Sequence, residues 1–173
     1  GRGVPQSDTE AVKWFRKAAK QGYAEAQSNL GVMYDEGRGV RKNHKEAVKW
    51  FQRAAEQGVA AAQTVLGMMF MEGRGVPKSY REGAKWLRKA AEQGRAEAQC
   101  LLGAMYADGR GVPQNEETAY MWFFIALNNG YGDAQAYMAY LEVYATANKV
   151  KLSPQEIARA KQRAREFLAK QGQ

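Results

Sequence analysis

Few side chains in this sequence are suited to catalysis. His44 is the only histidine and Cys100 the only cysteine, and a Cys–His pair would be the minimum for nucleophilic catalysis. Carboxylates recur at Asp35, Glu72 and Asp108, where a close pair would supply an acid and a base. The spacing of these residues matches neither a paired-carboxylate pocket nor the ligands of a zinc site. We therefore expect no catalytic residue, no metal and no cofactor.

A glycine-rich motif is the next candidate for chemistry. Gly-Arg-Gly-Val begins at residues 1, 37, 73 and 109, so that each copy starts 36 residues after the last. A nucleotide-binding loop would need a third glycine at a defined distance, or Gly-Lys followed by Ser or Thr, and the sequence has neither. The fixed period instead predicts a tandem repeat protein. We expect the glycines to form turns and the four arginines to bond helix-end carbonyls or mark one edge of the array: Arg2, Arg38, Arg74 and Arg110.

Each repeat predicts two helices. The first, called the B helix, carries an apolar stripe such as Ala11, Trp14, Phe15 and Ala18, and we expect it over residues 8–21, 43–58, 79–94 and 115–130. The second, the A helix, carries Ala-Gln, Leu-Gly and Met-aromatic pairs between the B helices. The expected N-caps of the B helices are Ser7, Asn43, Ser79 and Asn115, with Glu10 completing a capping box at Ser7. The glycines inside the A helices, expected to mark close approach of a neighbouring backbone, are Gly31, Gly67 and Gly103.

The positions of His44 and Cys100 within the repeat indicate what these two reactive side chains do. His44 occupies the position of Asp8, Tyr80 and Glu116 in the other copies, so we interpret it as a surface substituent. Cys100 occupies the position of Ser28, Thr64 and Ala136, so we interpret it as a small packing residue. A single cysteine also excludes an intramolecular disulfide.

These motifs together resemble a known family. The pattern Ala-x3-Leu-Gly-x2-Tyr-x2-Gly-x-Gly-Val, followed by Ala-x2-Trp-Phe-x2-Ala-Ala-x-Gln-Gly, is similar to the Sel-one-like repeat (SLR) family, a relative of the tetratricopeptide repeats. The resemblance covers residues 1–144 as four tandem repeats. It implies an all-α, right-handed α-solenoid of antiparallel helix pairs, with the A helices on its concave surface. It also implies a non-enzymatic scaffold or adaptor that binds a protein or peptide.

The fourth repeat and the tail predict a C-terminal cap. Positions that are mostly basic in three B helices become Met121, Phe124 and Ile125 in the last one, so something should cover them. Residues 145–173 are expected to form a linker and a capping helix over about 154–170, which begins with a Ser153–Glu156 capping box. Repeat arrays need such a cap, since an uncovered end exposes apolar surface.

The A helices also predict the binding surface. Residues on one face of these helices vary between copies, whereas the packing stripe does not. We expect this face to form a groove for a protein or peptide, the alternative being that some of its residues pack against the adjacent repeat. The groove residues are Ser28, Val32, Asp35, Thr64, Met68, Met71, Cys100, Ala104, Ala107, Ala136, Tyr140 and Val143.

The net charge of +8 is concentrated on the B helices. Their outward side is expected to form a basic ridge of Lys13, Arg16, Lys17, Lys49, Arg53, Lys85, Arg88 and Lys89. Nucleic-acid binding would need interleaved aromatic residues, and we expect Trp and Phe on the opposite, buried stripe. We therefore interpret the ridge as a solvated face and expect no nucleic acid, with an anionic partner as the alternative.

The location of the protein is left open by the sequence. The chain begins in phase with the repeat and without Met, so we expect a segment of a longer protein. Some bacterial members of the family act at the cell envelope, which makes an envelope accessory protein with a small or polymeric ligand the alternative function. A periplasmic or envelope location is expected if a signal peptide has been removed. The longest apolar runs fall far short of the ~20 residues that a membrane span needs.

Overall fold

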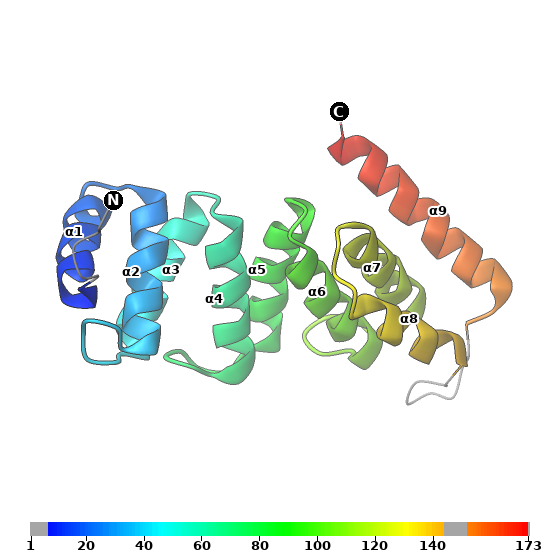
Figure 1. Cartoon of the computed structure of the whole chain (residues 1–173). Helices are drawn as coiled ribbons and strands as arrows, with labels where there is room; N and C mark the ends of the chain where they lie inside the picture. The colour runs from blue at the N-terminus through cyan, green and yellow to red at the C-terminus, as the bar shows by residue number, and fades with distance from the viewer. Residues whose placement is uncertain (1–6, 144–151, 173) are drawn as a thin grey trace. The chain divides into compact units, whose positions relative to one another are not determined.

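The computed structural model describes residues 7–143 and 152–172, which form nine α-helices and no strand (Figure 1). The B helices are α1 Asp8–Lys20, α3 His44–Glu56, α5 Tyr80–Glu92 and α7 Glu116–Asn128. The A helices are α2 Ala24–Glu36, α4 Ala60–Glu72, α6 Ala96–Asp108 and α8 Ala134–Val143, and the tail forms α9 Pro154–Gln171. The predicted all-α fold of helix pairs is confirmed, with helix bounds that differ from the expected ones by one or two residues.

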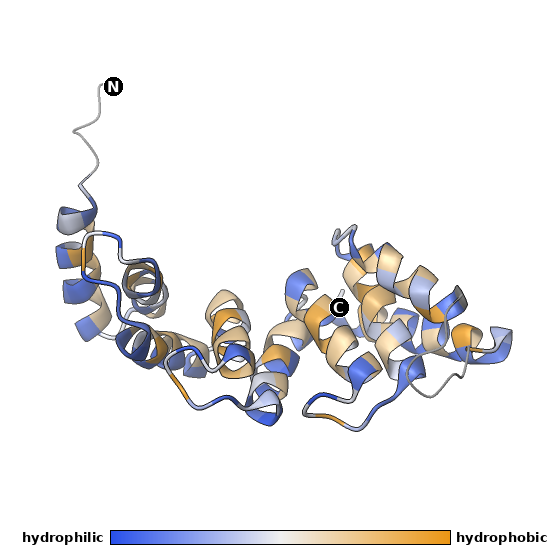
Figure 2. Cartoon of the chain, turned by 90° about the horizontal axis from the view of Figure 1, so that it is seen from below, coloured by the Kyte–Doolittle hydropathy of each residue, from blue (hydrophilic) through white to orange (hydrophobic). Residues whose placement is uncertain are grey.

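The chain forms two compact units, Gly1–Ser79 with α1 to α4 and Tyr80–Gln173 with α5 to α9. In the first unit each helix packs on the next, and α2 packs on α3 most extensively. In the second unit α7 packs on α6, α8 and α9. Hydrophilic and hydrophobic bands alternate along the helical ribbons in Figure 2, as expected when one face of a helix is packed and the other solvated.

The caps explain where the B helices begin. The side chains of Ser7, Asn43 and Asn115 accept hydrogen bonds from backbone N–H groups in the first turns of α1, α3 and α7. The capping box expected at Ser7 is only half formed, because the carboxylate of Glu10 pairs with Lys13 Nζ at 2.6 Å. The box at Ser153 and Glu156 is complete, as predicted.

Two of the glycines inside the A helices, Gly31 and Gly103, leave room for an aromatic ring. A Cβ added to Gly31 would lie 2.9 Å from the ring of Phe51, and one added to Gly103 would lie 2.8 Å from the ring of Phe123. The expected close approach is therefore made mainly by a phenylalanine of the following B helix rather than by its backbone. Ala139, the matching residue of α8, is exposed.

Buried glutamines link successive B helices within each unit. The Nε2 atom of Gln99 donates to the carbonyl of Ala91 at the end of α5 (2.9 Å), and its Oε1 accepts from Asn129 after α7 (3.0 Å). Gln27 makes the same two bonds in the first unit, to Ala19 and from Gln57. The sequence pattern contains this glutamine, but its bridging role was not predicted.

We expect Gln99→Leu to lower the free energy of unfolding by about 1–3 kcal/mol, because a buried carbonyl loses its donor while side-chain volume is nearly kept. Gln135→Leu is the matched control, since Gln135 is the exposed counterpart in α8 and should change stability by less than about 0.5 kcal/mol. Chemical denaturation followed by circular dichroism measures both. Equal effects of the two substitutions would show that the bridge contributes nothing.

Helix α9 covers α7, as the apolar substitutions predicted. Met121 and Ile125 are buried and Phe124 is partly buried. The ring of Phe167 meets the ring of Trp122 edge-on, with centroids 5.2 Å apart. Glu117 pairs with Arg159 and Arg163 of α9 at 3.0 and 3.3 Å, and Gln171 donates to the carbonyl of Glu92 in α5.

Candidate functional site

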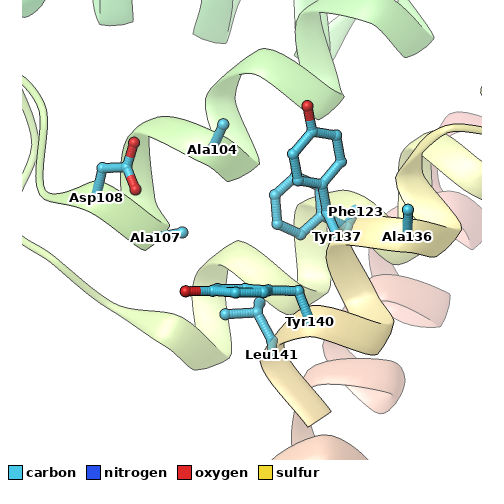
Figure 3. A pocket seen from close by; sticks show the side chains of 8 residues that line it. All are labelled: Ala104, Ala107, Asp108, Phe123, Ala136, Tyr137, Tyr140 and Leu141. Carbon is cyan, nitrogen blue, oxygen red and sulfur yellow. The ribbon is translucent and has the colours of Figure 1, made fainter. Parts of the chain in front are cut away.

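The second unit contains an apolar pocket of about 410 Å³ between α6 and α8, with α7 at its floor (Figure 3). It is called the α6–α8 pocket. Four of the predicted groove residues, Ala104, Ala107, Ala136 and Tyr140, are brought together here. The full lining is Ala104, Ala107, Asp108, Phe123, Ala136, Tyr137, Tyr140 and Leu141.

Two tyrosines of α8 form the walls of this pocket. Tyr137 and Tyr140 are 47% and 50% exposed, so about half of each residue's surface is open to solvent. Their i, i+3 spacing puts both rings on one side of α8, and Ala104 and Ala107 on α6 leave the space that the rings border (Figure 3). The ring of Tyr137 stacks on that of Phe123, with centroids 5.0 Å apart and planes inclined by 10°. Tyr137 of the pocket wall is thus held in place by Phe123 of α7.

The first position of the predicted groove stripe is packed in three of its four copies. Ser28, Thr64 and Cys100 are 8%, 1% and 5% exposed. The hydroxyl of Thr64 donates to the carbonyl of Ala60 at 2.9 Å. Burial, with a smaller contribution from Asp133, raises the pKa of the Cys100 thiol to about 11. These three side chains belong to the interior, the alternative that the sequence left open for part of the stripe, and Cys100 is a packing residue.

The remaining groove positions are not among the residues that line this pocket. Val32 lines a separate pocket of about 260 Å³ in the first unit, together with Phe15 and Arg38. Met68 and Met71 are partly buried on α4. Val143 ends α8, and its side chain lies outside the described residues.

The basic ridge is engaged in short-range contacts within single repeats. Lys13, Lys49 and Lys85 each pair with a glutamate three residues earlier at 2.6 Å. Arg16 and Arg88 donate to the hydroxyls of Tyr34 and Tyr106 on the following A helices. Exposed pairs of this kind contribute little to stability, so they satisfy charges rather than hold the fold.

The expectation that tryptophan and phenylalanine lie on a buried stripe opposite the ridge is met only in part: Trp50 and Trp122 are buried, but three tryptophans also contact ridge residues. The cationic groups of Lys17, Arg53 and Lys89 lie 5.8, 4.6 and 4.4 Å from the ring centroids of the tryptophans three residues earlier. Residues i and i+3 are neighbours on a helix, so each long basic side chain reaches back over the ring. Trp14 is also 66% exposed, whereas its counterpart Trp50 is 9% exposed in the core of the first unit.

Comparison with protein families identifies the repeat. The Sel1 repeat model matches residues 1–23, 24–59, 60–94 and 96–131. The chain belongs to the Sel1 repeat family. Sel1 repeats generally mediate protein–protein interactions and form a family of non-catalytic scaffolds. Comparison with curated proteins finds no match.

Solved bacterial structures support the same assignment. A Sel1 repeat protein from Oxalobacter formigenes is 35% identical, with a TM-score of 0.78 over 95% of this chain and 67% of its own. The protective antigen c5321 of uropathogenic Escherichia coli, which has an SLR fold, is 37% identical with a TM-score of 0.81 over all of this chain. The chain spans 36% of the length of c5321. Helicobacter pylori cysteine rich protein B shares the fold, at 23% identity and a TM-score of 0.61 over 79% of this chain and 99% of its own.

The arginines of the Sel1 loops bond helix-end carbonyls through their backbone N–H groups, at 2.9–3.0 Å to the carbonyls of Met33, Met69 and Met105. Their side chains instead contact carboxylates and, for Arg110, an aromatic ring. Arg38 pairs with Asp8 at 3.2 Å, and this contact raises the pKa of the guanidinium. Arg74 pairs with Asp35 at 3.0 Å. Arg110 pairs with Asp108 at 2.7 Å and lies over the ring of Tyr80. Arg2 lies outside the described residues.

Asp35 and His44 form a cluster that the sequence did not reveal. The Nδ1 atom of His44 lies 2.7 Å from Asp35 Oδ1, and Asp35 Oδ2 accepts from Arg74. The side chains of His44 and Asp35 are 32% and 13% exposed, so His44 is a partly buried ion-pair residue rather than a simple surface substituent. Asp35, one of the predicted groove residues, bonds Arg74 of the next Sel1 loop in the first unit.

Two further site types are not found in the described part of the chain. No set of three or more His, Cys, Asp or Glu side chains there is arranged to hold a metal ion. Among the same residues, no helix combines the length and apolar character that a bilayer crossing requires.

Proposed function

We propose that the protein is a non-enzymatic scaffold that binds a segment of a partner protein in the α6–α8 pocket. The observation that carries this proposal is the pair of half-exposed tyrosines that border one apolar pocket. Tyrosine supplies large apolar contact area with few rotatable bonds, so little side-chain entropy is lost when a partner covers it. A pocket with apolar walls and a few polar groups is the usual form of a binding site.

The shape of the pocket supports a side chain as its occupant. A volume of about 410 Å³ lies at the lower end of the range for ligand pockets, about 300–1,000 Å³. Phe123 holds Tyr137 by stacking, so one wall is ordered before a partner arrives. Binding then costs less conformational entropy than it would on a loop.

The test is affinity capture from a cell lysate with the wild-type chain and with Tyr137→Glu/Tyr140→Glu. We expect the double variant to lose its specific partners by at least tenfold in recovered amount, because two carboxylates in an apolar pocket must be desolvated on binding. Tyr23→Glu is the matched control, since Tyr23 is 63% exposed on the first unit and is not a lining residue of the pocket. Quantitative mass spectrometry and the melting temperature are read for each variant.

A second arm tests the basic ridge. Charge reversal at Lys49, Arg53 and Lys89 should leave partner recovery unchanged, since these side chains lie on B helices rather than at the pocket. Loss of partners in this variant, with full recovery in the tyrosine variant, would place binding on the ridge and refute the proposal.

A further inference from the structure

Charge is segregated between the two helix types. The chain contains 26 lysines and arginines, yet α2, α4, α6 and α8 contain none. In the second unit, residues 111–148 contain neither residue type. The charged residues of α6 and α8 are the carboxylates Glu97, Asp108 and Glu142. The pocket therefore lies on the least basic part of a strongly basic protein.

The pocket itself combines aromatic rings with a carboxylate. Asp108 is the charged residue among those that line it, and its side chain is 47% exposed. Figure 3 shows Asp108 on the α6 side of the space that the rings of Tyr137 and Tyr140 border on the α8 side. Oδ2 of Asp108 accepts from Arg110 at 2.7 Å, and Arg110 itself is not a lining residue.

We infer that the α6–α8 pocket accepts a cationic side chain, best an arginine, from the bound protein segment. This inference rests on the proposed function and names the chemistry of its partner. A guanidinium can stack on a tyrosine face and direct its N–H groups to a carboxylate at the same time. An acidic segment would be repelled by the carboxylates of α6 and α8, and complementary charge also accelerates encounter.

The protein already shows the contact that it would offer. Within its own chain, the guanidinium of Arg110 lies 6.0 Å from the ring centroid of Tyr80. That of Arg88 lies 5.9 Å from the ring centroid of Tyr106 and donates to its hydroxyl. Contact between arginine and tyrosine thus recurs in the second unit. The partner's arginine would place the same contact on rings that line an open pocket.

The test uses three blocked peptides, Ala-Leu-X-Leu-Ala, with arginine, its neutral isostere citrulline, or glutamate at X. Binding to the full chain is followed by NMR through the methyl signals of Ala104, Ala107 and Leu141, which line the pocket and are kept in every variant. At low salt we expect the arginine peptide to bind about fivefold or more tightly than the citrulline peptide, as a partly exposed cation–π contact allows. The glutamate peptide should bind most weakly.

Two variants, one of them with a matched control, show which residues produce the preference for arginine. Tyr137→Leu/Tyr140→Leu keeps apolar bulk but removes the ring faces, and should abolish the preference for arginine. Asp108→Asn should reduce it, whereas Glu97→Gln should not, because Glu97 is a carboxylate of the same helix that also neighbours an arginine but does not line the pocket.

The inference is overturned if the arginine peptide produces no shift at millimolar concentration, or if citrulline binds equally well. It is also overturned if the preference for arginine survives in the leucine variant. These outcomes are distinct from failure of the proposed function, which is judged by the dependence of whole-partner capture on Tyr137 and Tyr140. If capture depends on the tyrosines but the peptides show no preference for arginine, the proposed scaffold function stands and the inference of a cationic partner side chain fails.

Discussion

Gly39→Ala should unfold far more readily than Gly22→Ala, although both glycines have positive φ, +67° and +95°. An alanine in the left-handed region costs about 1–2 kcal/mol at either position. At Gly39 the new Cβ would also overlap the carbonyl group of Asp8 and lie 2.7 Å from the backbone nitrogen of Thr9, whereas nothing lies within 4 Å at Gly22. Overpacking of this kind costs a further amount of about 1–3 kcal/mol.

The loop glycine is needed because the loop crosses the backbone of an earlier helix. Neither atom of the Asp8 carbonyl can rotate away as a side chain could, so the loop or the first turn of α1 must shift. We expect a total loss of about 2–5 kcal/mol for Gly39→Ala, which for a chain of this size lowers the melting temperature by roughly 4–20 °C. Differential scanning calorimetry measures the melting temperatures of Gly39→Ala and Gly22→Ala. Equal melting temperatures would show that the close approach of Gly39 to Asp8 does not affect stability.

Ala164→Glu should detach α9 from α7. Ala164 is completely buried in the second unit, so a glutamate there must either bury its charge or force the helix away. Detachment would expose Met121, Trp122 and Ile125. We expect a loss of about 3 kcal/mol or more in the free energy of unfolding, together with lower solubility.

The matched control is Ala158→Glu, at an exposed alanine of the same helix. It should change stability by less than about 0.5 kcal/mol. Truncation of residues 153–173 should reproduce the effect of Ala164→Glu on melting and aggregation, because both remove the same cover. Urea denaturation and light scattering measure the two quantities, and a truncated chain that melts unchanged would refute the capping role of α9.

Much of the fold could be predicted because its determinants are local. The helix N-caps at Ser7 and Asn43 and the apolar stripes follow from residues within a few positions of one another. Because the repeat has a fixed period, each helix predicted in one copy could be compared with the matching residues of the other copies. Even α9 could be anticipated, because apolar residues at Met121 and Ile125 replace charges at matching positions.

The candidate site was predicted only in part. Comparison of the copies selected four residues that line one pocket in the structure, Ala104, Ala107, Ala136 and Tyr140, but it missed the other four, Asp108, Phe123, Tyr137 and Leu141. A signal for Tyr137 was present, since Tyr137 and Tyr140 lie three residues apart on one helix. Phe123 was assigned to the packing stripe, and the sequence could not show that one edge of a packed ring also forms the floor of a pocket.

The sequence alone determined the period, the helices, the repeat family and the need for a cap, because these depend on contacts close in the chain or on many repeated positions. Only the tertiary structure decided which equivalent residues are accessible. Cys100 is buried and Ala136 exposed at the same repeat position, and Trp14 is open while Trp50 is packed. Trp14 and Trp50 share the local sequence Glu-Ala-Val-Lys-Trp-Phe, and they differ because burial depends on whether another helix lies against that face.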